Sequence, residues 1–432
     1  MGEDRSALAS VWAVVLPLGW AAAVGCAHTP TVTPLVGDPA RPPSEAQVTR
    51  AWEDASEVFA RHDAAGAWDG EACRESLAAF EAIRTGDGAQ DARAVYMSGL
   101  VAERCGNEDG ARRLYERSVE LDPELCEPRT ALAARLMERG RSVEARAALE
   151  AAIARNARCA PAYLNLAVLQ SEDPDQREAA IDSLRRALAS RSDYLPALNQ
   201  MALVYLAMSE ARPELLDLAA VVCRQAQLVD DAYAPIYNTW ALIDVARGDV
   251  TAAVAKLARA RALDPSLFEA HMNFGQLTLS QRAYEDAARA FGEARALRPE
   301  SYDAAVGLGV ALRGLRRPDE AEASYRAALE IDAARAEAWF DLAVLYHEHR
   351  DGTVEQLRQA EAYLEEFVRR ARGVGRPSQT LERTLEETLR WCHDPPARRR
   401  RVTCHRGRAQ SLHDALVLHG AREDAERPAY TR

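Results

Sequence analysis

A tripeptide recurs along the chain at a nearly fixed distance, and this spacing constrains the fold more than any other feature. Leu263-Asp264-Pro265 is followed 34 residues later by Leu297-Arg298-Pro299, and Leu121-Asp122-Pro123 matches both. A period of about 20 to 50 residues indicates a fold built from copies of one supersecondary unit. The 432 residues are therefore expected to form mainly one array, not several globular domains.

The composition favours helices as the repeated element. Hydrophobic residues make up 48% of the chain but aromatic residues only 6%, and most of the apolar residues are alanine and leucine. Helices tolerate these two residues best, whereas strands favour β-branched and aromatic side chains. A charged fraction of 28% argues against a multi-span membrane protein and against a largely disordered chain. The expected fold class is all-α.

The residues inside each period resemble the tetratricopeptide repeat (TPR). In the unit that ends at Pro299 the matching residues are His271, Phe274, Gly275, Ala287, Phe291 and Ala294. The resemblance implies a right-handed TPR superhelix, an α-solenoid of about eight helix pairs plus capping helices. Each pair is too narrow to bury its apolar face alone, so small residues at three positions let the helices pack closely.

The N-terminus resembles a bacterial lipoprotein signal. Residues 7–25 carry no charge, and Ala23-Val24-Gly25-Cys26 resembles a lipobox. That resemblance implies cleavage after residue 25, lipidation of Cys26 and, because residue 27 is Ala, an outer-membrane location facing the periplasm. An uncleaved membrane anchor and an incidental apolar N-terminus are the alternatives.

These signals predict five regions. They are a signal peptide at 1–25, a Pro/Thr-rich linker at 26–45, a divergent helical cap at 46–91, the TPR array at 92–370, and a C-terminal region at 371–432. The C-terminal region is expected to contain a capping helix, an Arg-rich loop and a tail.

The TPR resemblance places partner binding on the concave face, which the first helix of each pair lines. Asparagines occur there in four units, and an asparagine amide can both donate to and accept from a peptide backbone. The expected partner-binding groove consists of Asn165, Asn199, Asn238, Asn273, Leu164, Val168, Leu203, Leu242, Met272 and Gln276. The expected partners are other proteins or peptides.

One variant of the family grips the carboxylate end of chaperones, and the sequence does not favour it here. That variant needs Lys and Arg at several groove positions. Only Arg104 and Arg313 meet this condition, and they lie in units far apart in the sequence.

The cysteines give a partial prediction. Lipidation of Cys26 would leave seven, an odd number that cannot all pair within the chain. Cys392 and Cys404 flank the Arg-rich loop and are candidates for a disulfide; free thiols, or a zinc site with the adjacent His393 and His405, are the alternatives. Cys73 and Cys105 could also bridge, and Cys223 is expected to be a buried small residue.

Charge and motifs exclude several functions. The net charge is −12. Residues 1–25 carry −1, residues 392–408 carry +5 from six arginines and one aspartate, and residues 409–432 carry −1, so residues 26–391 carry −15. Such an acidic body does not attract nucleic acid. The sequence contains no nucleophile elbow, zinc-protease motif or phosphate-binding loop. We expect no enzyme activity, cofactor, metal or small-molecule substrate.

The layout resembles TPR lipoproteins of bacterial envelope machines, among them pilus pilotins and myxobacterial gliding-motility lipoproteins. It therefore predicts a non-enzymatic scaffold, lipid-anchored at the outer membrane on the periplasmic side, that helps to assemble or tether a motility, pilus or secretion machine. The alternative is a membrane-anchored TPR regulator or co-chaperone on the cytoplasmic side.

Overall fold

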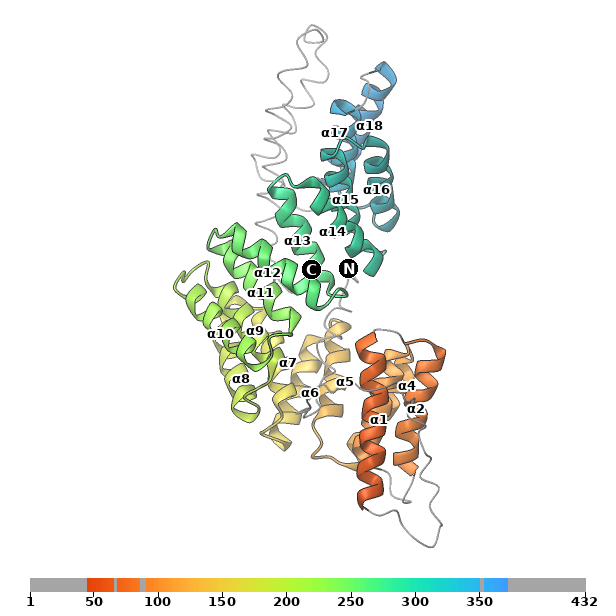
Figure 1. The fold of residues 1–432 in the computed structure, drawn as a ribbon, viewed down its shortest axis with the longest axis vertical. Coiled ribbons are helices and arrows are strands. Elements are labelled where there is room, and N and C mark those ends of the chain that lie inside the picture. The colour runs from red at the N-terminus through yellow and green to blue at the C-terminus, as the bar shows by residue number, and fades with distance from the viewer. Residues whose placement is uncertain (1–44, 66–67, 86–90, 350–352, 372–432) are drawn as a thin grey trace. The chain divides into compact units, whose positions relative to one another are not determined.

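The computed structural model describes residues 45–65, 68–85, 91–349 and 353–371, which form helices joined by turns (Figure 1). These residues contain no strand. No helix among them is long and apolar enough to cross a lipid bilayer. The predicted signal peptide, the linker up to residue 44, the C-terminal region beyond residue 371 and the pair Cys392–Cys404 lie outside the described residues.

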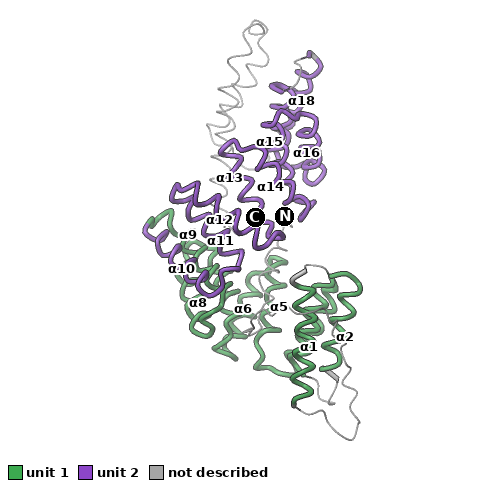
Figure 2. The backbone as a smooth tube through the Cα atoms, viewed as in Figure 1, with its two compact units in different colours: residues 1–213, 430–432 green, residues 214–429 purple. Residues whose placement is uncertain are grey.

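The described helices divide into two compact units (Figure 2). Unit 1, which extends to Pro213, contains α1 (Glu45–Ala65), α2 (Gly70–Thr85), α3 (Ala92–Arg104), α4 (Glu108–Leu121), α5 (Glu127–Glu138), α6 (Ser142–Arg155), α7 (Ala160–Ser171), α8 (Arg177–Ser190) and α9 (Leu195–Met208). Unit 2, which begins at Glu214, contains α10 (Leu215–Val229), α11 (Ala234–Ala246), α12 (Val250–Leu263), α13 (Phe268–Ser280), α14 (Tyr284–Leu297), α15 (Tyr302–Gly314), α16 (Pro318–Ile331), α17 (Glu337–Glu348) and α18 (Val354–Ala371).

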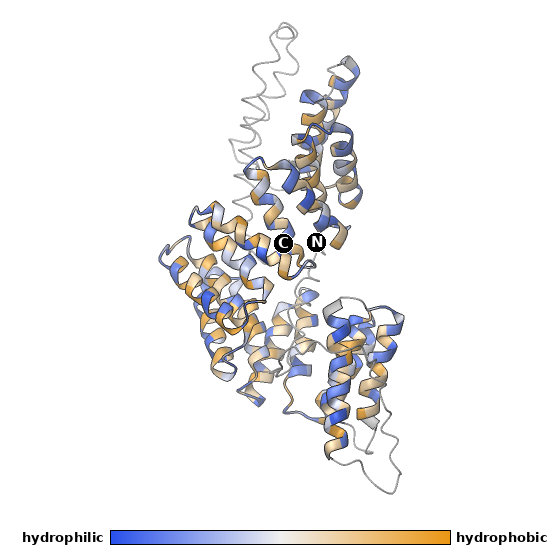
Figure 3. Ribbon diagram, in the orientation of Figure 1, coloured by the Kyte–Doolittle hydropathy of each residue, from blue (hydrophilic) through white to orange (hydrophobic). Residues whose placement is uncertain are grey.

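The helix order confirms the predicted repeat architecture. Helices α1 and α2 occupy the region expected to hold a divergent pair, and eight pairs follow from α3/α4 to α17/α18. A short 3₁₀ helix at Pro174–Gln176 lies between α7 and α8. Figure 3 shows hydrophobic and hydrophilic residues alternating along the helices, the pattern of helices that bury one face against a neighbour.

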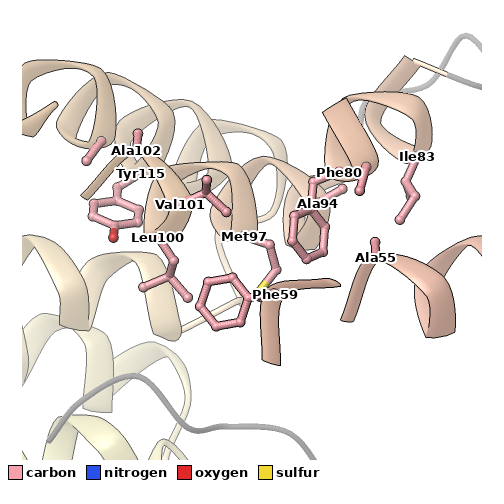
Figure 4. Close-up of a cluster of buried hydrophobic side chains, with 12 residues drawn as sticks. Ala55, Phe59, Phe80, Ile83, Ala94, Met97, Leu100, Val101, Ala102 and Tyr115 are labelled. Atoms are coloured by element: carbon pink, nitrogen blue, oxygen red, sulfur yellow. The ribbon is translucent and has the colours of Figure 1, made fainter. Parts of the chain in front are cut away.

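The divergent first pair is packed onto the repeats by aromatic side chains. Phe59 of α1 and Phe80 of α2 are buried with Met97 of α3, in a cluster that also includes Tyr115 of α4 (Figure 4). The ring centroids of Phe59 and Phe80 lie 6.4 Å apart, in an edge-to-face arrangement. The pair α1/α2 thus covers the apolar side of α3 that would otherwise be the open end of the array.

In several helix pairs, a small residue on the first helix lies opposite a larger residue on the second helix, and their sizes are matched. A Cβ atom added at Gly309 would lie 2.4 Å from the ring of Tyr325, and one at Gly99 would lie 2.5 Å from the ring of Tyr115. Where the second helix carries a leucine at this place, as at Leu257, the first helix carries an alanine, Ala241. Glycine therefore makes room for an aromatic ring, and alanine for a smaller side chain.

In five of the helix pairs, the turn between the two helices contains one residue with a left-handed backbone. Gly106, Gly140 and Gly248 have positive φ at this turn, and the equivalent residues of two later units are Arg282, with φ of 59°, and Arg316, with φ of 58°. An L-residue in this conformation is strained by about 1 to 2 kcal/mol, whereas glycine is not. The two arginines are thus local exceptions to the glycine rule of the turn.

Replacing these arginines by glycine is expected to stabilise unit 2. The relief of strain exceeds the extra entropy that glycine loses on folding, so Arg282→Gly and Arg316→Gly should each raise the free energy of unfolding by about 0.5 to 1 kcal/mol. Urea unfolding followed by circular dichroism measures the change. Gly248→Arg is the matched reverse variant and should lower the free energy of unfolding of unit 2. An equal effect of all three substitutions would contradict the claim that arginine is strained at this turn position.

Two disulfides link neighbouring helix pairs in unit 1. Cys73–Cys105 joins the first turn of α2 to the end of α3, with Cα atoms 5.9 Å apart. Cys126–Cys159 joins the residues just before α5 and α7, with Cα atoms 6.0 Å apart. The first bridge confirms a prediction, whereas the second was not predicted. Cys223 is buried and unpaired, as expected.

Candidate partner-binding face

The clearest polar feature on the first helices lies in unit 2. Nδ2 of Asn273 on α13 donates to Oδ1 of Asn238 on α11, at 2.8 Å. The two residues are 35 positions apart, so consecutive repeats bring them together on adjacent first helices. Within the described part of the chain this is the one hydrogen bond of either side chain, which leaves Nδ2 of Asn238 to donate and Oδ1 of Asn273 to accept.

Apolar side chains surround this asparagine pair. Leu242 on α11 and Met272 on α13 are half-buried, and Gln276 on α13 is exposed. Five of the ten predicted groove residues are therefore brought to the first helices of unit 2 with part of their surface accessible. The combination of an amide pair with accessible apolar surface suits a peptide segment better than a small polar ligand.

Two arginines on the first helices of other pairs are already bound to aspartates. Nη1 of Arg313 on α15 donates to Oδ1 of Asp341 on α17 at 2.8 Å, and both side chains are largely buried. Burial disfavours the charged guanidinium, but the neighbouring Asp341 outweighs it and holds the pKa of Arg313 above its ordinary value. In unit 1, Arg104 is bound to Asp63 at 2.7 Å. Both arginines are thus held by aspartates.

The predicted groove residues of unit 1 are placed differently. Leu164, Asn165 and Val168 on α7 are only 2%, 0% and 3% exposed, so they do not line an open groove in this structure. Helix α7 is buried on nearly every side. The repeat pattern of the sequence does not show how deeply a given first helix is buried. Both amide atoms of Asn165 lack a hydrogen-bond partner. Asn199 and Leu203 on α9 are half-buried. Partner binding by the ten residues stays a prediction.

The described residues show no metal-binding cluster. No group of three or more His, Cys, Asp or Glu side chains within them could hold a metal ion. Burial is the largest cause that raises the pKa of Tyr346, a half-buried residue, to about 12. Tyr346 donates a hydrogen bond to Glu322, which explains the rest of this shift without a catalytic role.

Family models decide the identity of the repeat. Models of the tetratricopeptide repeat match residues 92–125, 130–194, 238–291, 273–336 and 311–355, which together cover half of the chain. The chain is a tetratricopeptide-repeat protein. The matched ranges fall on the helix pairs of both units, and no curated protein sequence matches this TPR protein.

Solved structures share its fold. A chain in the crystal structure of the APC/C hetero-tetramer Cut9–Hcn1 matches with a TM-score of 0.50 and 15% identity, over 72% of this chain and 55% of that chain's length. YrrB, described as a TPR protein with an unusual peptide-binding site, matches with 22% identity and a TM-score of 0.32, over 44% of this chain and 95% of its own. PilF of Pseudomonas aeruginosa matches with 20% identity and a TM-score of 0.41, over 50% and 93%. The match to the Cut9–Hcn1 structure, at 15% identity, shows the fold alone.

Proposed function

We propose that this TPR protein is a non-enzymatic scaffold that binds partner proteins on the first-helix face of unit 2. The observation that carries the proposal is the Asn238–Asn273 hydrogen bond, which presents one donor and one acceptor side by side. An extended peptide offers a carbonyl and an N–H along one edge at matching intervals, so it can engage both amides whatever its sequence. The accessible surfaces of Leu242 and Met272 would contact its apolar side chains.

Removing both amides is expected to weaken partner binding. Each lost hydrogen bond is worth about 0.5 to 1.5 kcal/mol, so Asn238→Ala combined with Asn273→Ala should raise Kd about 10- to 100-fold. Calorimetric titration of the purified partner, identified by crosslinking in the native host, measures the change.

The control variant is Gln225→Ala, which removes an exposed amide from α10, a second helix of its pair. It should leave Kd unchanged. If the double variant retained the original Kd while its circular dichroism stayed native, the partner would bind elsewhere on the protein.

We also propose that the protein is anchored by lipid at Cys26 on the periplasmic side of the outer membrane, where it helps to assemble or tether a gliding-motility, pilus or secretion machine. The uncharged stretch 7–25 followed by Cys26 supports the anchor. The two disulfides of unit 1 support a compartment outside the cytoplasm, because disulfides persist in oxidising environments and are rare in the cytosol. They count against the alternative of a regulator on the cytoplasmic side.

Two measurements in the native host test this location. Cys26→Ala should abolish fatty-acid labelling and release the protein from the membrane fraction. Alkylation without prior reduction should leave Cys73, Cys105, Cys126 and Cys159 unmodified. Unchanged labelling of Cys26→Ala, or full alkylation of the four cysteines, would refute the proposed anchor or compartment respectively.

A further inference from the structure

The two disulfides follow the order of the cysteines in the chain. Going from the N-terminus through the described residues, Cys73 pairs with Cys105 and Cys126 pairs with Cys159, with separations of 32 and 33 residues. The shortest separation among these four cysteines is that of Cys105 and Cys126, 21 residues, and this pair is not used. The folded structure brings the observed partners together, but in the unfolded chain loop-closure entropy would favour the shorter Cys105–Cys126 loop.

The two bridges differ in exposure. Cys126 and Cys159 are only 4% and 1% exposed, whereas Cys73 and Cys105 are each half-buried. A thiol must be accessible to react with a disulfide donor. In the folded protein a donor can therefore reach the first pair but not the second.

We propose that the chain is a substrate of a disulfide-transfer oxidation that acts before unit 1 has folded, and that pairing in the order of emergence suffices without later isomerisation. Cys105 emerges when Cys73 is the one described cysteine available to it, and the two pair. Cys126 then has no earlier partner left and waits for Cys159. This order gives both observed bridges and avoids the shorter Cys105–Cys126 loop.

Each bridge forms by two thiol–disulfide exchanges with a protein disulfide donor. The thiolate of one cysteine attacks a donor sulfur, forming a mixed disulfide and releasing one donor thiolate. The thiolate of the second cysteine attacks the chain sulfur of that mixed disulfide and releases the other donor thiolate. The chain loses two protons and two electrons per bridge, and the donor is reduced to its dithiol.

Two of the four other cysteines, Cys223 and Cys26, are kept out of this pairing in different ways. Burial raises the pKa of the Cys223 thiol to about 12, so its reactive thiolate is scarce once unit 2 has folded. Cys26 precedes Cys73 in the chain and would compete for it; a thioether bond to lipid would block its sulfur. This inference thus rests on the proposed export and lipidation of the chain.

The test expresses the full chain in bacterial hosts that lack either the periplasmic disulfide isomerase or the periplasmic dithiol oxidase. Peptide mapping without reduction then identifies the pairs. We expect the same yield of Cys73–Cys105 and Cys126–Cys159 without the isomerase as in the parent host, and loss of both without the oxidase. A Cys105–Cys126 bridge in the isomerase-deficient host, or loss of the native pairs there, would overturn the inference.

A second measurement tests accessibility on the native protein. Reduced glutathione should open Cys73–Cys105 at least about tenfold faster than Cys126–Cys159, because the buried pair reacts only after local unfolding. Equal rates would remove the reason for oxidation before folding. Four free thiols in the native host would instead refute the proposed export, while native pairs that depend on the isomerase would refute this inference alone.

Discussion

Replacing Cys126 and Cys159 together by alanine is expected to lower the stability of unit 1 by about 3 to 4 kcal/mol. Their bridge closes a loop with a sequence separation of 33 residues, and the chain-entropy model gives a value of this size for such a loop. Repeat arrays draw their stability from contacts between neighbouring repeats. The loss should therefore concentrate on α5 to α8, where hydrogen exchange of the backbone amides should accelerate more than in α15 to α18.

Cys223→Ala is the matched control for this variant. It also removes a buried sulfur, but one that forms no bridge. It should cost about 1 kcal/mol or less and affect unit 2. If the variant without the Cys126–Cys159 bridge exchanged no faster than wild type in α5 to α8, the bridge would contribute nothing to stability.

Gly309→Ala is expected to destabilise unit 2 by about 2 to 3 kcal/mol. The added methyl group would lie 2.4 Å from Cε1 of Tyr325, whose ring is completely buried between the helices of its pair and cannot move aside without displacing its neighbours. Gly292→Ala is the matched control, because no atom lies within 4 Å of its added Cβ. This control should stabilise α14 by up to about 1 kcal/mol, through the higher helix propensity of alanine. Urea unfolding of the two variants measures the difference.

A second substitution should rescue this variant. Gly309→Ala with Tyr325→Leu recreates the Ala241 and Leu257 combination found elsewhere in unit 2. The Tyr325 hydroxyl is buried without a hydrogen-bond partner, so its removal costs little. We expect a favourable coupling free energy of at least about 1 kcal/mol between the two substitutions. Purely additive effects would show that ring and methyl group do not compete for the same space.

The repeat period made most of the fold predictable. The Pro265 to Pro299 spacing, with small residues at fixed places between them, was enough to predict the eight helix pairs from α3 to α18. The same period could have identified the Cys126–Cys159 bridge, because residues one period apart start equivalent helices of adjacent repeats.

Which of the predicted groove residues are accessible was harder to predict than the fold. Sequence register places Asn165 and Asn273 at the same position of their repeats, yet Asn165 is completely buried while Asn273 is half-exposed. Accessibility depends on what covers each first helix, which a repeat pattern does not encode. Size matching was likewise hidden, because Gly309 and Ala241 both read simply as small residues until their neighbours Tyr325 and Leu257 are seen.

Photo-crosslinking from the first-helix face in the native host tests the central claim most directly. A photoreactive amino acid at Leu242, half-buried beside Asn238, should give a discrete protein adduct that disappears when Asn238 and Asn273 are replaced by alanine. The same group at Val221, which is 62% exposed on α10, should give no such adduct. An adduct from Val221 but not from Leu242 would contradict the claim that partner proteins bind this face.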